Sequence, residues 1–222
     1  MLYRVSHLVV LAVFRVLWRP TVQGRDHIPS FGPLIVASNH LSFIDSIVIP
    51  LVVPRKVVFL AKAEYWEGRS PASWPRRLFF ALFEAVPVQR EQQQDAQASL
   101  DLARQVLERG HAFGIYPEGT RSRDGRLYRG RTGVGWLAMA AQARVVPVGL
   151  VGTDAVQPIG ATVPRVRRGV TIRFGEPVDP ADFAHLPPGR ARREITDTVM
   201  ERIAALSGQE LAAGYNERPI EA

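Results

Sequence analysis

The segment NHLSFID places a histidine, His40, five residues before an aspartate, Asp45. Histidine is the usual general base near neutral pH because its unperturbed pKa is about 6.5. A carboxylate that accepts a hydrogen bond from one ring nitrogen leaves the other nitrogen able to take a proton from a hydroxyl. On a continuous helix the two side chains would point about 140° apart, so a turn must bring them together. The spacing therefore predicts a general base with its orienting partner, although such pairs also cap helices or bind metal ions.

A second polar segment, YPEGTRS, combines groups that commonly bind phosphate. Gly119 allows a turn with available backbone N–H groups, Thr120 and Ser122 carry hydroxyls, and Arg121 offers a planar fork of donors. Glu118 could hold that arginine or a free hydroxyl of the substrate. An ordinary polar loop has similar residues, so the segment by itself leaves both interpretations open.

Apolar runs and helical periodicity place both polar segments after strands. The predicted strands span residues 34–38, 57–61, 86–88, 112–116, 145–151 and 170–174. Helices are predicted at residues 65–85, 94–109, 133–143 and 192–206, with a further helix entered through Ser42 as N-cap and Asp45 in its first turn. Because strands alternate with helices, the predicted fold class is α/β, with a mostly parallel central sheet flanked by helices. Open sheets of this class bind ligands at the carboxyl ends of their strands, where the two polar segments should meet.

The first 22 residues are expected to form a separate amphipathic helical segment that associates with a membrane. Their longest apolar run, Leu8 to Phe14, is well short of the ~20 residues that span a bilayer. Arg4, Arg15 and Arg19 fall on one side of a helix whose other sides are apolar, which is typical of a helix lying among lipid headgroups. A core helix and a signal peptide are the alternatives. Residues 65–85 mix aromatic side chains with arginine, which suits a membrane-facing helix and a core helix equally.

Length and composition fit one domain, which we predict to cover residues 23–222. The formal charge of +7 indicates an acidic partner. Only Lys56 and Lys62 among the 28 basic residues are lysine, so the composition favours arginine throughout and a single arginine carries little information. The absence of cysteine excludes disulfides, thiolate zinc sites and a cysteine nucleophile.

Two other classes of protein would explain part of this pattern. A metal hydrolase could use a histidine and an aspartate, but the remaining histidines show no paired ligand spacing. A nucleic-acid-binding module would explain the charge, but the chain has neither zinc-finger spacing nor an aromatic RNA-binding block. We therefore expect no metal, no cofactor and no nucleic-acid partner.

Together the two polar segments resemble the PlsC-type glycerophospholipid acyltransferase family, which includes the 1-acylglycerol-3-phosphate acyltransferases. The resemblance runs from about Gly32 to Gly152. The run VPV at residues 146–148 resembles the family's fourth sequence block, and Gly133 ahead of a predicted helix agrees with it.

The resemblance assigns roles to individual residues. It implies that His40 and Asp45 are the catalytic pair. The predicted substrate-binding residues are Glu118, Gly119, Thr120, Arg121, Arg90 and Lys62. Arg90 ends a second block that is less typical of the family. Lys62 follows a predicted strand, where a solvated loop lysine is the alternative.

The resemblance also implies a reaction. The chain would move a fatty acyl group from an acyl thioester, acyl-CoA or acyl carrier protein, to the sn-2 hydroxyl of 1-acylglycerol 3-phosphate. The product would be phosphatidic acid. Another lysolipid or glycerol 3-phosphate is the alternative acceptor. The expected setting is the cytoplasmic face of the cell membrane, with the protein peripheral or monotopic on the membrane surface.

Overall fold

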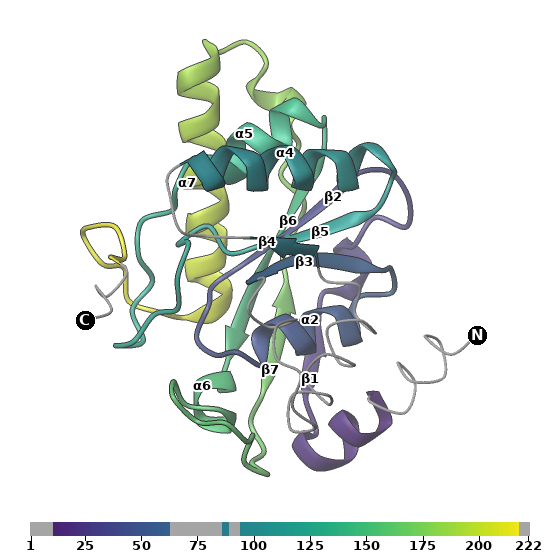
Figure 1. Cartoon of the computed structure of the whole chain (residues 1–222), viewed down its shortest axis with the longest axis vertical. Helices are drawn as coiled ribbons and strands as arrows, with labels where there is room; N and C mark the ends of the chain where they lie inside the picture. The colour runs from purple at the N-terminus through teal and green to yellow at the C-terminus, as the bar shows by residue number, and fades with distance from the viewer. Residues whose placement is uncertain (1–10, 63–85, 89–93, 218–222) are drawn as a thin grey trace.

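The structure is a computed structural model that describes residues 11–62, 86–88 and 94–217 (Figure 1). Within these residues seven strands form one sheet in the order β1-β7-β6-β2-β5-β3-β4. The strands are β1 Thr21–Gln23, β2 Leu34–Ser38, β3 Val57–Lys62, β4 Val86–Val88, β5 Ala112–Ile115, β6 Arg144–Val151 and β7 Thr171–Phe174. All six strands predicted from apolar runs are present. The additional strand, β1, has only three residues and an exposed pattern, so no apolar run marks it.

The sheet is mostly parallel, as predicted. Strand β2 pairs in parallel with both β5 and β6, and β3 pairs in parallel with β5 and β4. Strand β7 is antiparallel to β6 and carries β1 on its other side. The carboxyl ends of β2, β5, β3 and β6 therefore meet at one edge of the sheet, and the loops that follow these strands lie there.

Helices cover both faces of the sheet and create two hydrophobic cores. The helices are α2 Asp45–Val52, α4 Gln94–Glu108, α5 Gly133–Ala140, α6 Thr153–Val156 and α7 Pro188–Ser207, with 3-10 turns η1 Arg25–His27 and η4 Pro180–Phe183. Helix α2 packs on one face of β2 through Val48 and Ile49, in the core that also contains Leu34 and Val36. Helices α4, α5 and α7 pack on the other face (Figure 1). Alternate residues of β2 thus face different cores, as expected for a buried strand.

Two predicted helix starts differ from the structure. Helix α2 begins at Asp45 with Ile44 as its N-cap, so the prediction of Ser42 as N-cap is wrong. Residues 41–44 instead form the turn that encloses the Asp45 carboxylate. Helix α7 begins at Pro188, four residues before the predicted start at Arg192, because proline is well tolerated in the first helical turn. The helix predicted for residues 65–85 lies outside the described residues.

The described part of the N-terminal segment is helical and packs on the domain. Residues 11–18 form a helix in which Phe14 is buried in the core shared with β2 and α2. Leu11 and Trp18 pack against the same core, whereas Val13 and Val16 are exposed. One face of this helix therefore packs in the core, as the alternative interpretation of the sequence expected. Strand β1 crosses the predicted division after residue 22.

No helix within the described ranges is long and apolar enough to cross a membrane.

Candidate active site

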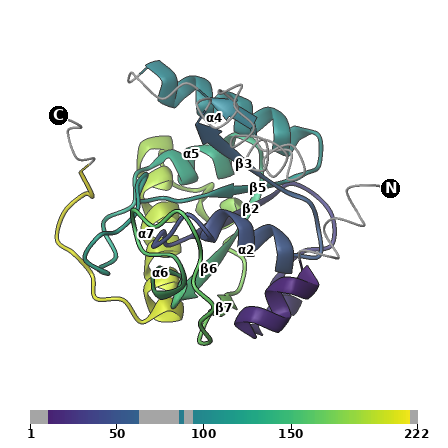
Figure 2. The ribbon, with the colours of Figure 1, turned by 60° about the horizontal axis from the view of Figure 1, so that its bottom comes forward.

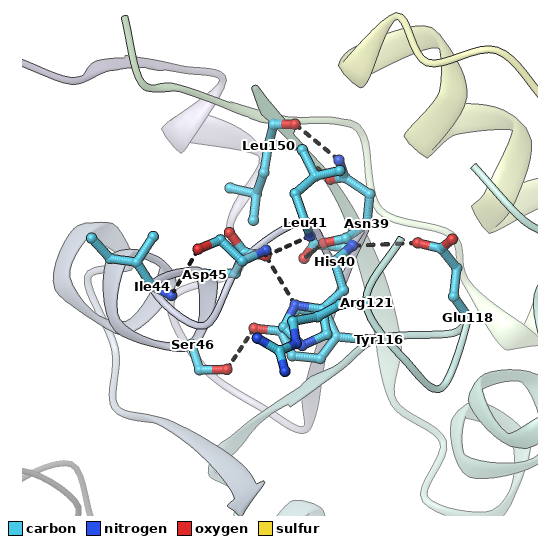
Figure 3. Close-up of polar contacts among 12 residues, drawn as sticks. Asn39, His40, Leu41, Ile44, Asp45, Ser46, Tyr116, Glu118, Arg121 and Leu150 are labelled. Carbon is cyan, nitrogen blue, oxygen red and sulfur yellow. Dashed lines mark hydrogen bonds and ion pairs between the residues drawn. The ribbon is translucent and has the colours of Figure 1, made fainter. Parts of the chain in front are cut away.

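The predicted hydrogen bond between the histidine and the aspartate is present at the carboxyl end of β2. The Nδ1 atom of His40 lies 2.9 Å from Oδ2 of Asp45 (Figure 3). Because an ionised carboxylate can only accept, Nδ1 carries the hydrogen in this pair and Nε2 is left with its lone pair. The imidazole is thus held in the tautomer that can take a proton from a hydroxyl.

The turn before α2 is built around the Asp45 carboxylate. Oδ2 also accepts the backbone N–H groups of Leu41 and Ser42, both at 2.7 Å. The side chain is fully buried, and it stands in the first turn of α2, where the helix dipole favours negative charge. Three donors on one buried oxygen fix the carboxylate, and through it the plane of the His40 ring.

Asn39 fixes the start of this turn to the neighbouring strand. Its side chain donates from Nδ2 to the carbonyl of Leu150 at 2.9 Å and accepts the Leu150 N–H on Oδ1 at 2.8 Å. These two hydrogen bonds continue the ladder between β2 and β6 by one side chain. The Nδ2 group also donates to Oε1 of Gln209 at 2.7 Å. The chain therefore leaves β2 in a fixed direction immediately before His40.

A row of aromatic rings supports the imidazole. The ring of Tyr116, just after β5, stacks on the ring of His40 with 3.7 Å between centroids and 7° between planes. The Tyr116 hydroxyl shares a 2.8 Å hydrogen bond with the hydroxyl of Ser46 on α2. The ring of Phe59 on β3 stacks in turn on the ring of Tyr116, with 5.5 Å between centroids, and lies against Gly114, which has no side chain. Sequence reasoning did not identify Tyr116 or Phe59, because their contacts depend on which strands are neighbours.

The second polar segment lies directly beside the turn that contains His40. The backbone N–H of Ser122 donates to the carbonyl of His40 at 2.8 Å. Gly119 closes the preceding turn with φ of +81°, a conformation that favours glycine, and its N–H donates to the carbonyl of Tyr116. The two polar segments that the sequence analysis singled out are therefore in direct contact. This confirms the prediction that they meet at the carboxyl ends of the strands.

Glu118 joins the two loops through backbone groups rather than through Arg121. Its carboxylate accepts the N–H of His40 at 3.3 Å and the N–H of Tyr128 at 3.0 Å. Only 1% of the residue is exposed. Burial raises the pKa of Glu118 to about 7, although the two N–H hydrogen bonds act in the opposite direction. The role of Glu118 in this structure is to position the loops, and contact with a substrate stays a prediction.

Thr120 and Arg121 are partly exposed, as are Tyr116 and Gly119 of the same segment. Arg121 immediately precedes the residue that bonds to the His40 carbonyl, so its guanidinium belongs to the same edge of the sheet as the imidazole (Figure 3). Among the described residues, no hydrogen bond or ion pair holds this guanidinium. An arginine guanidinium can bind an anion through paired hydrogen bonds.

A C-terminal segment, residues 209–216, covers the loop that follows Glu118. The backbone of Leu127 bonds to Glu210 and Ala212, and Asn216 donates from Nδ2 to the carbonyl of Arg121 at 3.2 Å. Gln209, which accepts from Asn39, also donates to the carbonyl of Gly125. This segment thus contacts both the turn that contains His40 and the loop that follows Glu118. It has no apolar periodicity, and nothing in the sequence indicated its position.

Two predicted substrate-binding residues are only partly placed. Lys62 is the last residue of β3, paired with Val88 of β4, so its backbone lies at the carboxyl edge with the other site residues. Arg90 lies outside the described residues. No cluster of three or more histidine, aspartate or glutamate residues that could hold a metal ion is found in the part of the chain that the structure describes.

A mostly parallel α/β sheet with an Asp-oriented histidine at its carboxyl edge has the arrangement of an enzyme that works by general-base catalysis. Comparison with known proteins defines the family. A family model described as Acyltransferase matches residues 19–151, which is more than half of the chain. The chain therefore belongs to this acyltransferase family.

Individual relatives agree with the family. The 1-acyl-sn-glycerol-3-phosphate acyltransferase of Bacillus subtilis is 26% identical over 85% of this chain and 88% of its own length. The human 1-acyl-sn-glycerol-3-phosphate acyltransferase alpha is 31% identical over 59% of this chain, but the match spans only 44% of that protein. The crystal structure of a 1-acyl-sn-glycerophosphate acyltransferase, PlsC, from Thermotoga maritima has the same fold. It matches with a TM-score of 0.64 and 24% identity, over 91% of this chain and 82% of that one.

We expect Glu118 to make the stability of the protein depend on pH. Its pKa is about 7 in the folded protein and 4.5 in its unperturbed state, so the folded state binds the proton more tightly. The resulting stabilisation is complete below pH ~4.5 and is lost as the pH rises through ~7, by at most about 1.4 kcal/mol per pH unit. The midpoint temperature of thermal unfolding, measured between these pH limits, should therefore fall more steeply with pH for wild type than for Glu118→Gln.

Glu201→Gln, at an exposed position on α7, is the matched control and should follow the wild-type curve. Parallel curves for Glu118→Gln and wild type would show that burial does not perturb this carboxyl group.

We also expect the ring of Tyr116, more than its hydroxyl, to support acyl transfer. Tyr116→Leu removes the stacked face and should lower kcat by up to about tenfold, because such ring pairs contribute roughly 0.5–1.5 kcal/mol. Tyr116→Phe keeps the ring and should retain most of the turnover. Ser46→Ala cuts the same hydrogen bond as Tyr116→Phe and should behave like it. Equal losses in the Leu and Phe variants would show that the stacking has no role.

Proposed function

We propose that this chain transfers a fatty acyl group from an acyl thioester to the sn-2 hydroxyl of 1-acylglycerol 3-phosphate, giving phosphatidic acid. The observation that carries the proposal is the 2.9 Å hydrogen bond between His40 and Asp45, directly beside the loop that contains Arg121. The family match and the printed names of the Bacillus and human relatives support it.

The mechanism follows from the tautomer that Asp45 imposes. Nε2 of His40 removes the proton from the acceptor hydroxyl as its oxygen attacks the thioester carbonyl carbon. The buried Asp45 carboxylate stabilises the imidazolium that forms. The tetrahedral intermediate then breaks its carbon–sulfur bond, and the departing thiolate takes the proton from Nε2. An ester and a free thiol result, with His40 restored and no covalent acyl-enzyme on the path.

The phosphate of the acceptor would bind to the partly exposed residues of the 118–121 loop. Arg121 offers a guanidinium that can form two parallel hydrogen bonds to phosphate oxygens, and Thr120 offers a hydroxyl. Glu118 contributes by holding the loop against His40. Lys62 lies at the same edge of the sheet and, with Arg90, completes the predicted substrate-binding set.

The donor would be acyl-CoA or acyl carrier protein. Both are acidic, and the formal charge of +7 suits either. The acceptor is a lipid, so the protein would work as a peripheral or monotopic enzyme on the cytoplasmic face of the cell membrane. Glycerol 3-phosphate and other lysolipids are the alternative acceptors within the same chemistry.

A product screen tests the reaction. Purified full-length protein in detergent is offered 1-acylglycerol 3-phosphate, glycerol 3-phosphate and a lysophospholipid with each donor, and the products are identified by mass spectrometry. Phosphatidic acid should form, and His40→Ala should abolish it because the variant lacks the proposed general base. His185→Ala, at an exposed position before α7, serves as the control and should keep full turnover. Retained turnover in folded His40→Ala would refute the mechanism.

Arg121→Ala should weaken acceptor binding specifically through the phosphate. Loss of a charge-assisted hydrogen-bonded contact of about 1.5–3 kcal/mol corresponds to a KM for 1-acylglycerol 3-phosphate raised roughly ten- to hundredfold. The same variant should show a much smaller change with 1-acylglycerol, which lacks the phosphate. Arg123→Ala, an exposed arginine two residues further on, controls for general loss of positive charge. Similar changes with both acceptors would contradict the phosphate role.

A further inference from the structure

Two segments far apart in the sequence lie side by side at one end of the molecule. The helix of residues 11–18 contacts the loop of residues 158–169, which connects α6 to β7, because Nε1 of Trp18 donates to the carbonyl of Arg165 at 2.7 Å. Figure 1 and Figure 2 both show the purple helix near the green loop beyond α6. We call the two segments together the basal surface.

The basal surface carries exposed apolar side chains. Val16, Val163 and Val166 are each 72% exposed, and Val13 is 47% exposed. A single exposed valine is ordinary, but several on two contacting segments form a patch of the kind that binds another apolar phase.

The same two segments are strongly basic. Their arginines are Arg15 in the helix and Arg165, Arg167 and Arg168 in the loop, all of them exposed. Exposed Arg19 directly follows the helix, and neither segment contains an acidic residue. Positive charge interleaved with exposed apolar side chains matches an anionic lipid surface, which offers phosphate groups above a hydrocarbon layer.

The loop is also joined to the catalytic turn. The hydroxyl of Ser42 donates to the carbonyl of Gln157 at 2.6 Å, and Gln157 donates in turn to the carbonyl of Ala161 at 3.0 Å. The N–H of Arg165 closes the loop on Val156 at 2.7 Å. A surface bound to this loop is therefore held close to His40, which is the position a lipid acceptor needs.

We propose that residues 158–168, together with the helix of residues 11–18, dock the protein on an anionic lipid bilayer. The valines enter the boundary between headgroups and acyl chains, and the arginines bind lipid phosphates. The proposal rests on the proposed function only in that a lipid acceptor gives the docking its purpose. Binding to vesicles and catalysis in detergent test the two separately.

The first test measures where the loop lies when the protein is bound. The chain contains no cysteine, so Val163→Cys in the full-length protein gives a single site for an environment-sensitive fluorophore. Its emission should shift to the blue and rise when vesicles of phosphatidylcholine mixed with phosphatidylglycerol are added. His185→Cys, in the loop between η4 and α7 at the opposite end of Figure 1, is the matched control and should not change. A label at position 163 that stays in water on vesicle-bound protein overturns the proposal.

The second test measures affinity. In flotation with the same vesicles, Arg167→Ala combined with Arg168→Ala should weaken binding about thirtyfold at low salt, because each arginine near an anionic surface contributes about fivefold. Val163→Ser combined with Val166→Ser should weaken binding at all salt concentrations. Both double variants should keep wild-type turnover on detergent-solubilised acceptor. If the double variants float like wild type, the proposal is overturned. It is also overturned if the variants lose binding to acyl carrier protein but keep binding to vesicles. A wild-type protein that floats but has no activity contradicts only the proposed function.

Discussion

The site depends on one buried negative charge. The Asp45 carboxylate, fully enclosed at the start of α2, accepts hydrogen bonds from the His40 ring and from two backbone N–H groups on the same oxygen. An isolated buried carboxylate would be strongly unfavourable, so these donors and the helix N-terminus are what make its burial tolerable. Because the turn folds around the charge, the orientation of the imidazole is a consequence of how the chain enters the helix. The hydrogen bonds that orient His40 are therefore the same ones that shape the local fold.

The sheet brings the second loop to this charge, and two further contacts hold it there. Parallel pairing of β2 with β5 puts both loops at one edge, Glu118 ties them through backbone groups, and Tyr116 stacks on the imidazole. The rigid strands thus set the approximate position, while a buried carboxyl group and an aromatic ring set the final alignment. Arg121, which is partly exposed, lies in the second loop beside His40.

Most of the sheet and the contact between His40 and Asp45 could be predicted from the sequence, for a physical reason. Buried parallel strands such as β2 and β6 are uninterrupted apolar runs, and the five-residue spacing of His40 and Asp45 allows contact only across a turn. Glu118 was predicted to hold Arg121 or a substrate hydroxyl, and the substrate contact stays a prediction. Its bonds to backbone N–H groups could not be predicted, because these groups are the same in every sequence and leave no signal. The stacking of Tyr116 and the burial of Phe14 depend on the arrangement of distant elements.

The order of synthesis gives the segment of residues 209–216 a particular consequence. The loop of residues 118–131 takes part of its hydrogen bonding from this later segment, through Leu127, Arg129 and Arg121. During translation the central strands can pair before this partner exists, but the loop beside the general base cannot reach its final shape. The loop beside His40 therefore reaches its full hydrogen bonding only after residues 209–216 have been synthesised.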